Sequence, residues 1–158
     1  WIVELGRADV IAEVSTLASF LAAPREGHLE AVVHIYSYMK LKHNSRLVFD
    51  PTYPEHLRDA FQSHDWEHFY GEVEEAIPPN APLPQGKEMD LTMYVDSDHA
   101  GDKRSRRLRT GYFILMNSAL VAWLSKKQPT VKTSVFGAEF VAMKMGWNAC
   151  EGFATSYA

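Results

Sequence analysis

Three aspartates lie within nine residues of the sequence, at the point where a hydrophobic run ends. The stretch YVDSDHAGD, residues 94–102, contains Asp96, Asp98 and Asp102. Asp96 and Asp98 are two positions apart, so on an extended strand end their side chains project from the same face. Oxygen-only ligands of this kind select Mg²⁺ or Mn²⁺ over zinc. A solvated acidic turn is the simplest alternative to a metal site.

A calcium-binding loop is a third interpretation of the same stretch, and it fails in detail. The helix–loop–helix calcium motif needs glycine at the sixth position of its loop and glutamate at the twelfth. Counted from Asp96, those positions hold Gly101 and Arg107. The glycine fits the motif, but the closing carboxylate is missing.

A further carboxylate comes from a distant part of the sequence. Glu139 lies one turn into a helix predicted from TSVFGAEFVAMKMGW, residues 133–147. If that helix crosses the strand that ends near Asp96, the two carboxylates meet. Two ionised carboxylates held together are costly unless a cation lies between them. The residues therefore predict a metal site formed by Asp96 and Glu139, with Asp98 beside it.

Basic residues surround the ends of the same predicted strands. Residues 91–158 hold nine basic against five acidic residues, whereas residues 50–90 hold ten acidic against two basic ones. Such a cluster beside a carboxylate pair can bind the phosphates of a nucleic acid while metals carry the chemistry. A charged loop without a partner is the alternative. The basic cluster consists of Lys103, Arg104, Arg106, Arg107, Arg109, Lys126, Lys127 and Lys132.

Hydrophobic spacing predicts the elements in the first half of the chain. Apolar residues at helical spacing predict a helix in residues 9–22 and a second helix after Pro24, with an apolar stripe from Leu29 to Met39. We expect these two helices to form an antiparallel pair. Residues 46–49 predict a short strand, and the acidic, proline-rich residues that follow predict a connector with one short helix.

Three strands and a helix are predicted after the connector. EMDLTMYVD, TGYFILMN and ALVAWLS have strand composition, and the tight NSA connection predicts a hairpin between the last two. Thr133 or Ser134 is a candidate N-cap for the helix that follows. Phe136, Phe140 and Met143 form its predicted apolar stripe.

Composition excludes several classes of protein. With 46% hydrophobic residues the chain can form a core, and its single cysteine, Cys150, excludes an intramolecular disulfide and a cysteine-based zinc site. No apolar run reaches the roughly 18 residues of a membrane span, and no secretion signal opens the sequence. We therefore expect an intracellular protein, in the cytoplasm or nucleus, without membrane contact. Because the first residue is Trp1, we also expect the sequence to be part of a longer reading frame.

Several segments, in this order and spacing, resemble the ribonuclease H domain of copia-type LTR retrotransposon polyproteins. They are YVDSDHAGD, RRLRTGYFILMNSALVAWLSKKQPTVKTS and GAEFVAM, and upstream RADVIAEVSTLASFLAAPREGHLEAVVHIYSYMK resembles the helical end of reverse transcriptase. The resemblance covers most of residues 5–146. It implies an α+β chain with three parts: a reverse transcriptase helical pair in residues 1–49, an acidic connector in residues 50–88, and an incomplete ribonuclease H-like mixed sheet with a packed helix in residues 89–158.

The resemblance also implies a chemistry, which is hydrolysis of RNA in RNA–DNA hybrids with two Mg²⁺ (or Mn²⁺) ions. Asp96 matches the catalytic aspartate of the first strand, Glu139 matches the catalytic glutamate of the helix, and Asp98 matches an acidic position beside them. Gly137 stands where the family has another glutamate. The family carries two further catalytic carboxylates on later elements that this sequence does not contain.

We therefore expect weak or no nuclease activity from the chain without the remainder of the polyprotein. A non-catalytic module that binds nucleic acid through the basic cluster is one alternative. A degenerate retroelement remnant is another.

Overall fold

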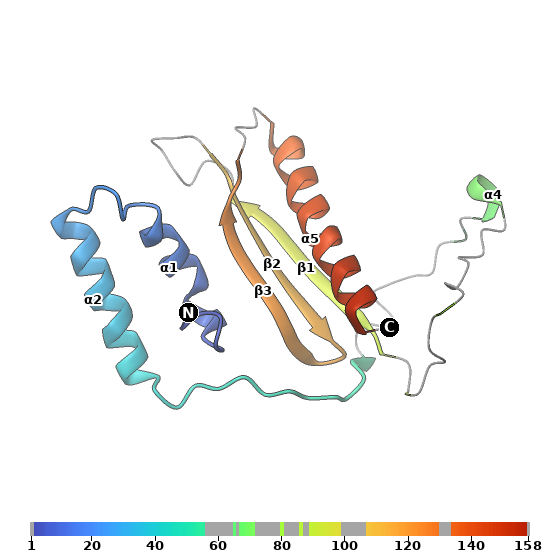
Figure 1. The fold of residues 1–158 in the computed structure, drawn as a ribbon, viewed down its shortest axis with the longest axis horizontal. Coiled ribbons are helices and arrows are strands. Elements are labelled where there is room, and N and C mark those ends of the chain that lie inside the picture. Colours follow the sequence, from blue (N-terminus) through green and yellow to red (C-terminus); the bar gives the residue numbers. More distant parts are fainter. Residues whose placement is uncertain are drawn as a thin grey trace.

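The computed structural model describes residues 2–55, 65, 67–71, 80, 86, 89–98, 107–129 and 134–157. Two helices lie beside a three-stranded sheet, and a long helix crosses that sheet (Figure 1). The α+β class predicted from the sequence is confirmed. Within these ranges no helix combines the length and hydropathy needed to cross a membrane.

The N-terminal part confirms the predicted pair of helices. A 3-10 turn, η1 (Ala8–Val10), leads into α1 (Ile11–Ala18), and α2 (Glu26–Leu41) follows. α1 ends earlier than the periodicity predicts, because the chain turns through tighter hydrogen bonds such as that from the Ser19 backbone N–H to the Thr16 carbonyl, 3.1 Å long. At the start of α2 the backbone N–H of Arg25 donates to Nδ1 of His28, 3.1 Å away, which closes the first turn.

The predicted apolar stripe of α2 is only partly covered. Val32 and Met39 are half-buried, but Leu29 and Tyr36 are 64% and 65% exposed. α1 is eight residues long, half the length of α2, so it covers only part of that face. Between the two helices lies an apolar groove of about 440 Å³.

The prediction of a strand in residues 46–49 is wrong. This segment has no regular structure, and Val48 and Phe49 are more than two thirds exposed. Pro51 and Thr52, just after this segment, are instead hydrogen-bonded to the turn between β2 and β3. Nδ2 of Asn117 donates to the Pro51 carbonyl, and Oγ of Ser118 donates to the Thr52 carbonyl. Most of the predicted connector helix lies outside the described residues, which show α4 (Glu67–Tyr70).

The three predicted strands are confirmed. β1 (Leu91–Asp98), β2 (Arg109–Met116) and β3 (Ala119–Lys127) form an antiparallel sheet in the order β1-β2-β3. The tight connection between β2 and β3 holds Asn117 at a φ of 53°, a left-handed conformation that asparagine tolerates better than most residues. Oδ1 of Asn117 also accepts the backbone N–H of Asp90, which ties this turn to the start of β1.

The helix α5 (Val135–Tyr157) covers one face of the sheet and runs alongside β1 in the opposite direction (Figure 1). The predicted N-cap at Ser134 is confirmed, because its Oγ accepts the backbone N–H of Gly137 over 3.1 Å. The predicted apolar stripe of Phe136, Phe140 and Met143 does not face the sheet. The buried positions are the small residues Ala138, Ala142 and Gly146.

Close approach of helix and strand explains why α5 buries small residues. A Cβ atom added to Gly146 would overlap the sulfur of Met93, and a methyl group of Val95 lies 3.5 Å from the same point. Larger side chains on this face would force Met93 to shift or α5 to move away from β1. The large residues Phe136, Phe140 and Met143 therefore point outward and are at least half exposed.

The N-terminal part contacts the opposite edge of the sheet. Oγ of Ser15, in α1, donates to the Ser125 carbonyl in β3 over 2.6 Å. Nε1 of Trp123 donates to the Val3 carbonyl over 2.9 Å. Residues on β3 are thus joined to residues more than 100 positions away in the sequence.

Candidate functional site

The two predicted aspartates lie near the end of β1 and project from one face of it. Asp96 and Asp98 are both exposed, whereas Ser97 between them is 6% exposed. In the sheet register Asp96 lies opposite Gly111, and Asp98 lies opposite Arg109. Oδ1 of Asp96 accepts the backbone N–H of Ser97 over 2.8 Å, so one carboxylate oxygen is directed back toward the chain.

The face of β1 that carries Asp96 is not the face that α5 covers. Met93 and Val95 lie against Gly146 of α5. Side chains alternate between the two faces of a strand, so the side chains of Asp96 and Tyr94 project from the opposite face. Tyr94 is 49% exposed, which agrees with a face that α5 does not cover.

Glu139 is positioned by α5 and is half-buried. It directly follows Ala138, which is fully buried against the sheet. The structure thus brings the predicted helix onto the predicted strand. The Asp96 side chain, however, projects from the face of β1 opposite to the one that Met93 and Val95 present to α5.

The donor set does not complete a metal site in the described part of the chain. No group of three or more His, Cys, Asp or Glu side chains is arranged there to hold an ion. Mg²⁺ demands near-ideal octahedral oxygen geometry, and a two-ion site needs carboxylates that bridge or flank both ions. Asp96, Asp98 and Glu139 do not fit such a site by themselves.

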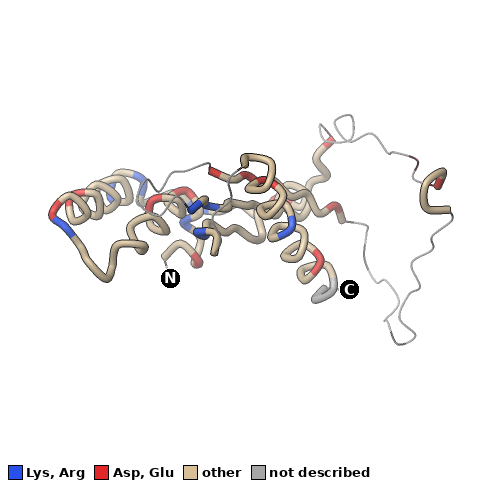
Figure 2. The backbone as a smooth tube through the Cα atoms, turned by 90° about the horizontal axis from the view of Figure 1, so that it is seen from above, with Lys and Arg blue, Asp and Glu red and all other residues tan. Residues whose placement is uncertain are grey.

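The predicted basic cluster is only partly within the described residues, since Lys103, Arg104, Arg106 and Lys132 lie outside them. The other members gather at one end of the sheet, where Arg109 pairs with Lys127 and Thr110 pairs with Lys126. Lys126 is exposed, whereas Lys127 is half-buried. Arg107 is exposed beside them. Figure 2 shows acidic and basic residues interleaved along the described chain.

Arg109 has a structural contact that the sequence did not reveal. Its guanidinium donates to Oγ and to the carbonyl of Ser15, and more weakly to Oγ of Ser19 at 3.4 Å. Arg109 thereby joins β2 to α1. This residue was predicted to bind nucleic acid, and any phosphate it binds competes with these contacts.

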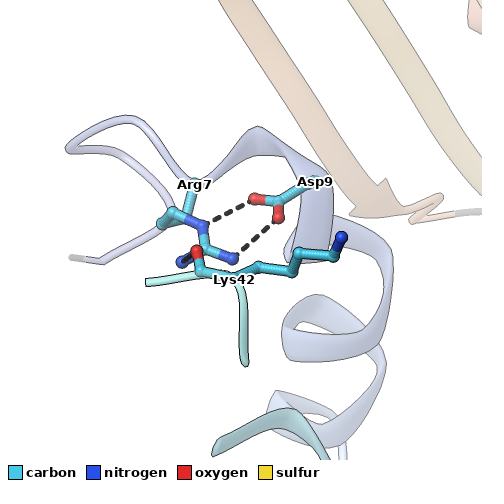
Figure 3. A network of polar contacts seen from close by, with 3 residues as sticks. All are labelled: Arg7, Asp9 and Lys42. Carbon is cyan, nitrogen blue, oxygen red and sulfur yellow. Dashed lines mark hydrogen bonds and ion pairs between the residues drawn. The ribbon is translucent and has the colours of Figure 1, made fainter. Parts of the chain in front are cut away.

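A second polar network involves Arg7 and Asp9 (Figure 3). Nε and Nη2 of Arg7 donate to the two carboxylate oxygens of Asp9, over 2.9 and 2.8 Å. Nη1 of Arg7 reaches the carbonyl of Lys42 at 3.4 Å, just beyond the end of α2. The Arg7 hydrogen bonds lower the pKa of Asp9 below its usual value, and those to Asp9 raise the pKa of Arg7. The network fixes the N-terminal turn against the end of α2.

Gln128 is a buried polar residue that sequence reasoning did not single out. It is fully buried, and its Nε2 donates to Oγ1 of Thr110 over 3.0 Å and to the carbonyl of Ala138 over 3.2 Å. Its backbone N–H donates to the Leu108 carbonyl over 2.7 Å. The hydrogen bonds of Gln128 therefore fix the position of the first turn of α5 relative to β2. Because Glu139 follows Ala138, they also help to position Glu139. The only signal in the sequence was a polar residue directly after two lysines.

Comparison with known proteins shows relatives of very different lengths. The chain is 26% identical over 136 residues to the retrovirus-related Pol polyprotein from transposon TNT 1-94 of Nicotiana tabacum, covering 86% of this chain and 8% of that protein. It is 25% identical over 134 residues to the Pol polyprotein from transposon RE1 of Arabidopsis thaliana, covering 85% of this chain and 7% of that protein. A shorter match, 45% identical over 53 residues, is to the secreted RxLR effector protein 161 of Plasmopara viticola, covering 34% of this chain and 37% of the effector.

The two matches that span most of the chain show that it is similar in sequence to the Pol polyproteins of plant copia-type retrotransposons. The chain spans less than a tenth of the length of each of the two polyproteins. The activities of the complete polyproteins are therefore not assigned to this chain. No protein-family model and no solved structure matches the sequence.

Proposed function

We propose that the chain is a piece of a retrotransposon Pol polyprotein that engages RNA–DNA hybrids, with residues 89–158 as the first part of a ribonuclease H-like domain. Residues 1–49 are then the helical end of reverse transcriptase, and residues 50–88 are the connector between them. The observation that carries the proposal is the arrangement of β1, β2, β3 and α5, an antiparallel meander with one helix across its face. It has the element order that the resemblance implies, and the relationship to Pol polyproteins supports it.

On this proposal Asp96 and Glu139 are two members of a larger set of carboxylates that holds Mg²⁺ or Mn²⁺ inside the cell, and Asp98 lies beside them. The bound ions would activate the attacking water and stabilise the leaving oxygen. Positioned charge supplies most of the rate in such sites, so an incomplete set of two or three carboxylates is expected to leave weak or no cleavage. The nuclease chemistry then requires the remainder of the polyprotein.

Binding without cleavage is the second candidate, and the basic end of the sheet favours it. Arg107, Lys126 and Lys127 lie at adjacent strand ends, and each lysine or arginine that meets a phosphate makes binding weaker as the salt concentration rises. Lys126 is the most suitable residue to test, because it is exposed and pairs with Thr110 only through the backbone register.

The test uses a labelled RNA–DNA hybrid and a DNA duplex of the same sequence. We expect the chain to bind the hybrid more tightly than the DNA duplex, with an affinity that falls as salt rises, and to cleave little of it in Mg²⁺ or Mn²⁺. Lys126→Ala should weaken binding several-fold and reduce the salt dependence by about one phosphate contact. Glu30→Gln, an exposed change on α2, is the control for both assays.

The outcomes separate the two candidates. Cleavage that disappears in Glu139→Gln and persists in Glu30→Gln would establish that the present carboxylates still hold working metals. Hybrid binding without cleavage in any variant would establish the binding module. Equal or absent binding of both duplexes would refute the proposed engagement of hybrids.

A further inference from the structure

The guanidinium of Arg109 is directed at α1 through both of its terminal nitrogens. Nη1 donates to Oγ of Ser15, and Nη2 donates to the Ser15 carbonyl over 3.3 Å and to Oγ of Ser19 over 3.4 Å. A phosphate bound by two parallel N–H groups uses Nη2 together with either Nη1 or Nε. Because Nη2 already donates to α1, a phosphate bound in this way at Arg109 displaces at least one contact with α1.

A phosphate is the stronger acceptor of the two competitors. The acceptors that α1 offers to Arg109 are hydroxyl oxygens and a carbonyl oxygen, all of them neutral. Hydrogen bonds between a guanidinium and a charged oxygen are shorter and roughly twice as strong as bonds between neutral groups. The exchange of α1 for a phosphate is therefore favourable at the guanidinium itself.

The charges around Arg109 also allow a phosphate to approach. In the sheet register Arg109 lies between Asp98 of β1 and Lys127 of β3, and Lys126 precedes Lys127. Asp98 is the nearest acidic residue in that register, and the three cations outnumber it. Glu13, the acidic residue of α1, lines a groove against α2 instead. A phosphate at Arg109 therefore meets net positive charge.

α1 is attached to the sheet by polar contacts rather than by a buried core. All of its side chains are at least partly exposed. Ser15 makes two of the contacts, since its Oγ accepts from Arg109 and donates to the Ser125 carbonyl over 2.6 Å. α1 has eight residues, fewer than the roughly 12–15 that an isolated helix needs to be stable in water. Release of α1 thus exposes little apolar surface, and released α1 loses helical order.

We propose that α1 is an autoinhibitory element that competes with the phosphates of a nucleic acid for Arg109. In the free chain α1 occupies the guanidinium. When an RNA–DNA hybrid binds, one of its phosphates takes the bonds of Nη2, and α1 leaves the sheet. The two events are negatively coupled, so each weakens the other by the same factor. This inference rests on the proposed engagement of hybrids and adds a regulation of that engagement.

Ser15→Ala tests the competition, with the labelled RNA–DNA hybrid as the probe. The variant removes an acceptor of Arg109, so the hybrid no longer has to displace that contact. We expect its dissociation constant for the hybrid to fall at least about 5-fold, which is the lower end of typical coupling between sites. Ser37→Ala, whose hydroxyl bonds within α2, is the matched control and should bind like the unmodified chain.

The same pair of proteins in an Arg109→Ala background tests whether Arg109 carries the effect. Without the guanidinium, Ser15→Ala should change the dissociation constant by less than about two-fold. An undiminished gain in this background would show that α1 shields the sheet in another way, and it would overturn the exchange at Arg109. Circular dichroism should confirm that each variant is folded.

Amide hydrogen exchange of the unmodified chain tests the release of α1 without any substitution. Saturation with the hybrid should speed exchange in α1 and leave α2 unchanged. Protection of α1 by the hybrid would mean that α1 is part of the binding surface, which contradicts the proposal. Hybrid binding with unchanged exchange in α1 and no gain from Ser15→Ala would refute the autoinhibition and leave the engagement of hybrids standing. Absence of hybrid binding in every variant would refute both.

Discussion

At the scale of single residues, a well-defined ion pair lies away from the predicted site, between Arg7 and Asp9. Both carboxylate oxygens of Asp9 accept from the guanidinium, and the Arg7 side chain is 14% exposed. Arg7 also lies over the ring of Tyr38, 5.7 Å from its centroid. Bidentate geometry of this kind is worth more than an ordinary surface pair, although solvent still screens it.

The depressed pKa of Asp9 makes this contribution depend on pH. A carboxyl group whose pKa is lower in the folded than in the unfolded chain stabilises the fold above its unfolded pKa, about 3.9, and loses that effect as the pH falls through its folded pKa. Asp9→Asn should therefore reduce the free energy of unfolding by about 0.5–1 kcal/mol at pH 7 and by less at pH 3. Urea denaturation at both pH values measures this.

Glu13→Gln, an exposed change of the same charge on α1, is the control for the Asp9 variant. A loss of stability that is equal at pH 7 and pH 3 would show that Asp9 acts through packing rather than through its charge.

At the scale of elements, the contact between α5 and β1 determines which residues α5 can bury. Gly146 lies so close to the end of the Met93 side chain that Met93 must shift to admit even a Cβ atom. Gly152, further along the same helix, has no atom within 4 Å of the point that a Cβ atom would occupy. The two glycines therefore respond oppositely to the same substitution.

Gly146→Leu should lower the free energy of unfolding by about 1–3 kcal/mol, because Met93 must leave its position or α5 must move off β1 to accept the side chain. Gly152→Leu should leave stability unchanged or raise it by up to about 1 kcal/mol, since leucine has the higher helix propensity. Thermal or urea unfolding of the two variants provides the comparison. Equal effects at both positions would contradict the close contact with Met93.

The sequence correctly predicted the elements that depend on interactions between residues close together in the chain. The strands, the turn at Asn117 and the N-cap at Ser134 follow from alternation and turn or cap chemistry within a few residues. Residues 46–49 have strand composition but no strand, because pairing depends on whether a sheet edge is available to them. Composition alone does not contain that information.

The same limit applies to the candidate site. The sequence correctly predicted that the helix packs against the sheet, but whether Asp96 and Glu139 meet depends on which face of β1 the helix covers. Met93 and Val95 occupy the covered face, so Asp96 lies on the other. A preference for large apolar residues also selected Phe136 and Phe140 as core, whereas the close approach of α5 favoured Ala138 and Ala142.

At the scale of the whole molecule, the helical pair and the sheet are joined by a small number of polar contacts. Ser15 is central, because its Oγ donates to the Ser125 carbonyl and accepts from the guanidinium of Arg109. The hydrogen bond from Trp123 to the Val3 carbonyl lies on the same edge of the sheet. If these contacts couple the helical pair to the sheet, α1 and β3 unfold locally in one cooperative step rather than independently.

Ser15→Ala should therefore lower stability by about 1–3 kcal/mol, because the Ser125 carbonyl and the Arg109 guanidinium both lose a partner. Amide hydrogen exchange followed by mass spectrometry should show faster exchange in α1 and β3 by a similar factor. Ser37→Ala is the control, since Oγ of Ser37 bonds to the Val33 carbonyl within α2. Faster exchange confined to α1 would mean that the sheet is stable without the helical pair, and that residues 89–158 can be studied as a separate unit.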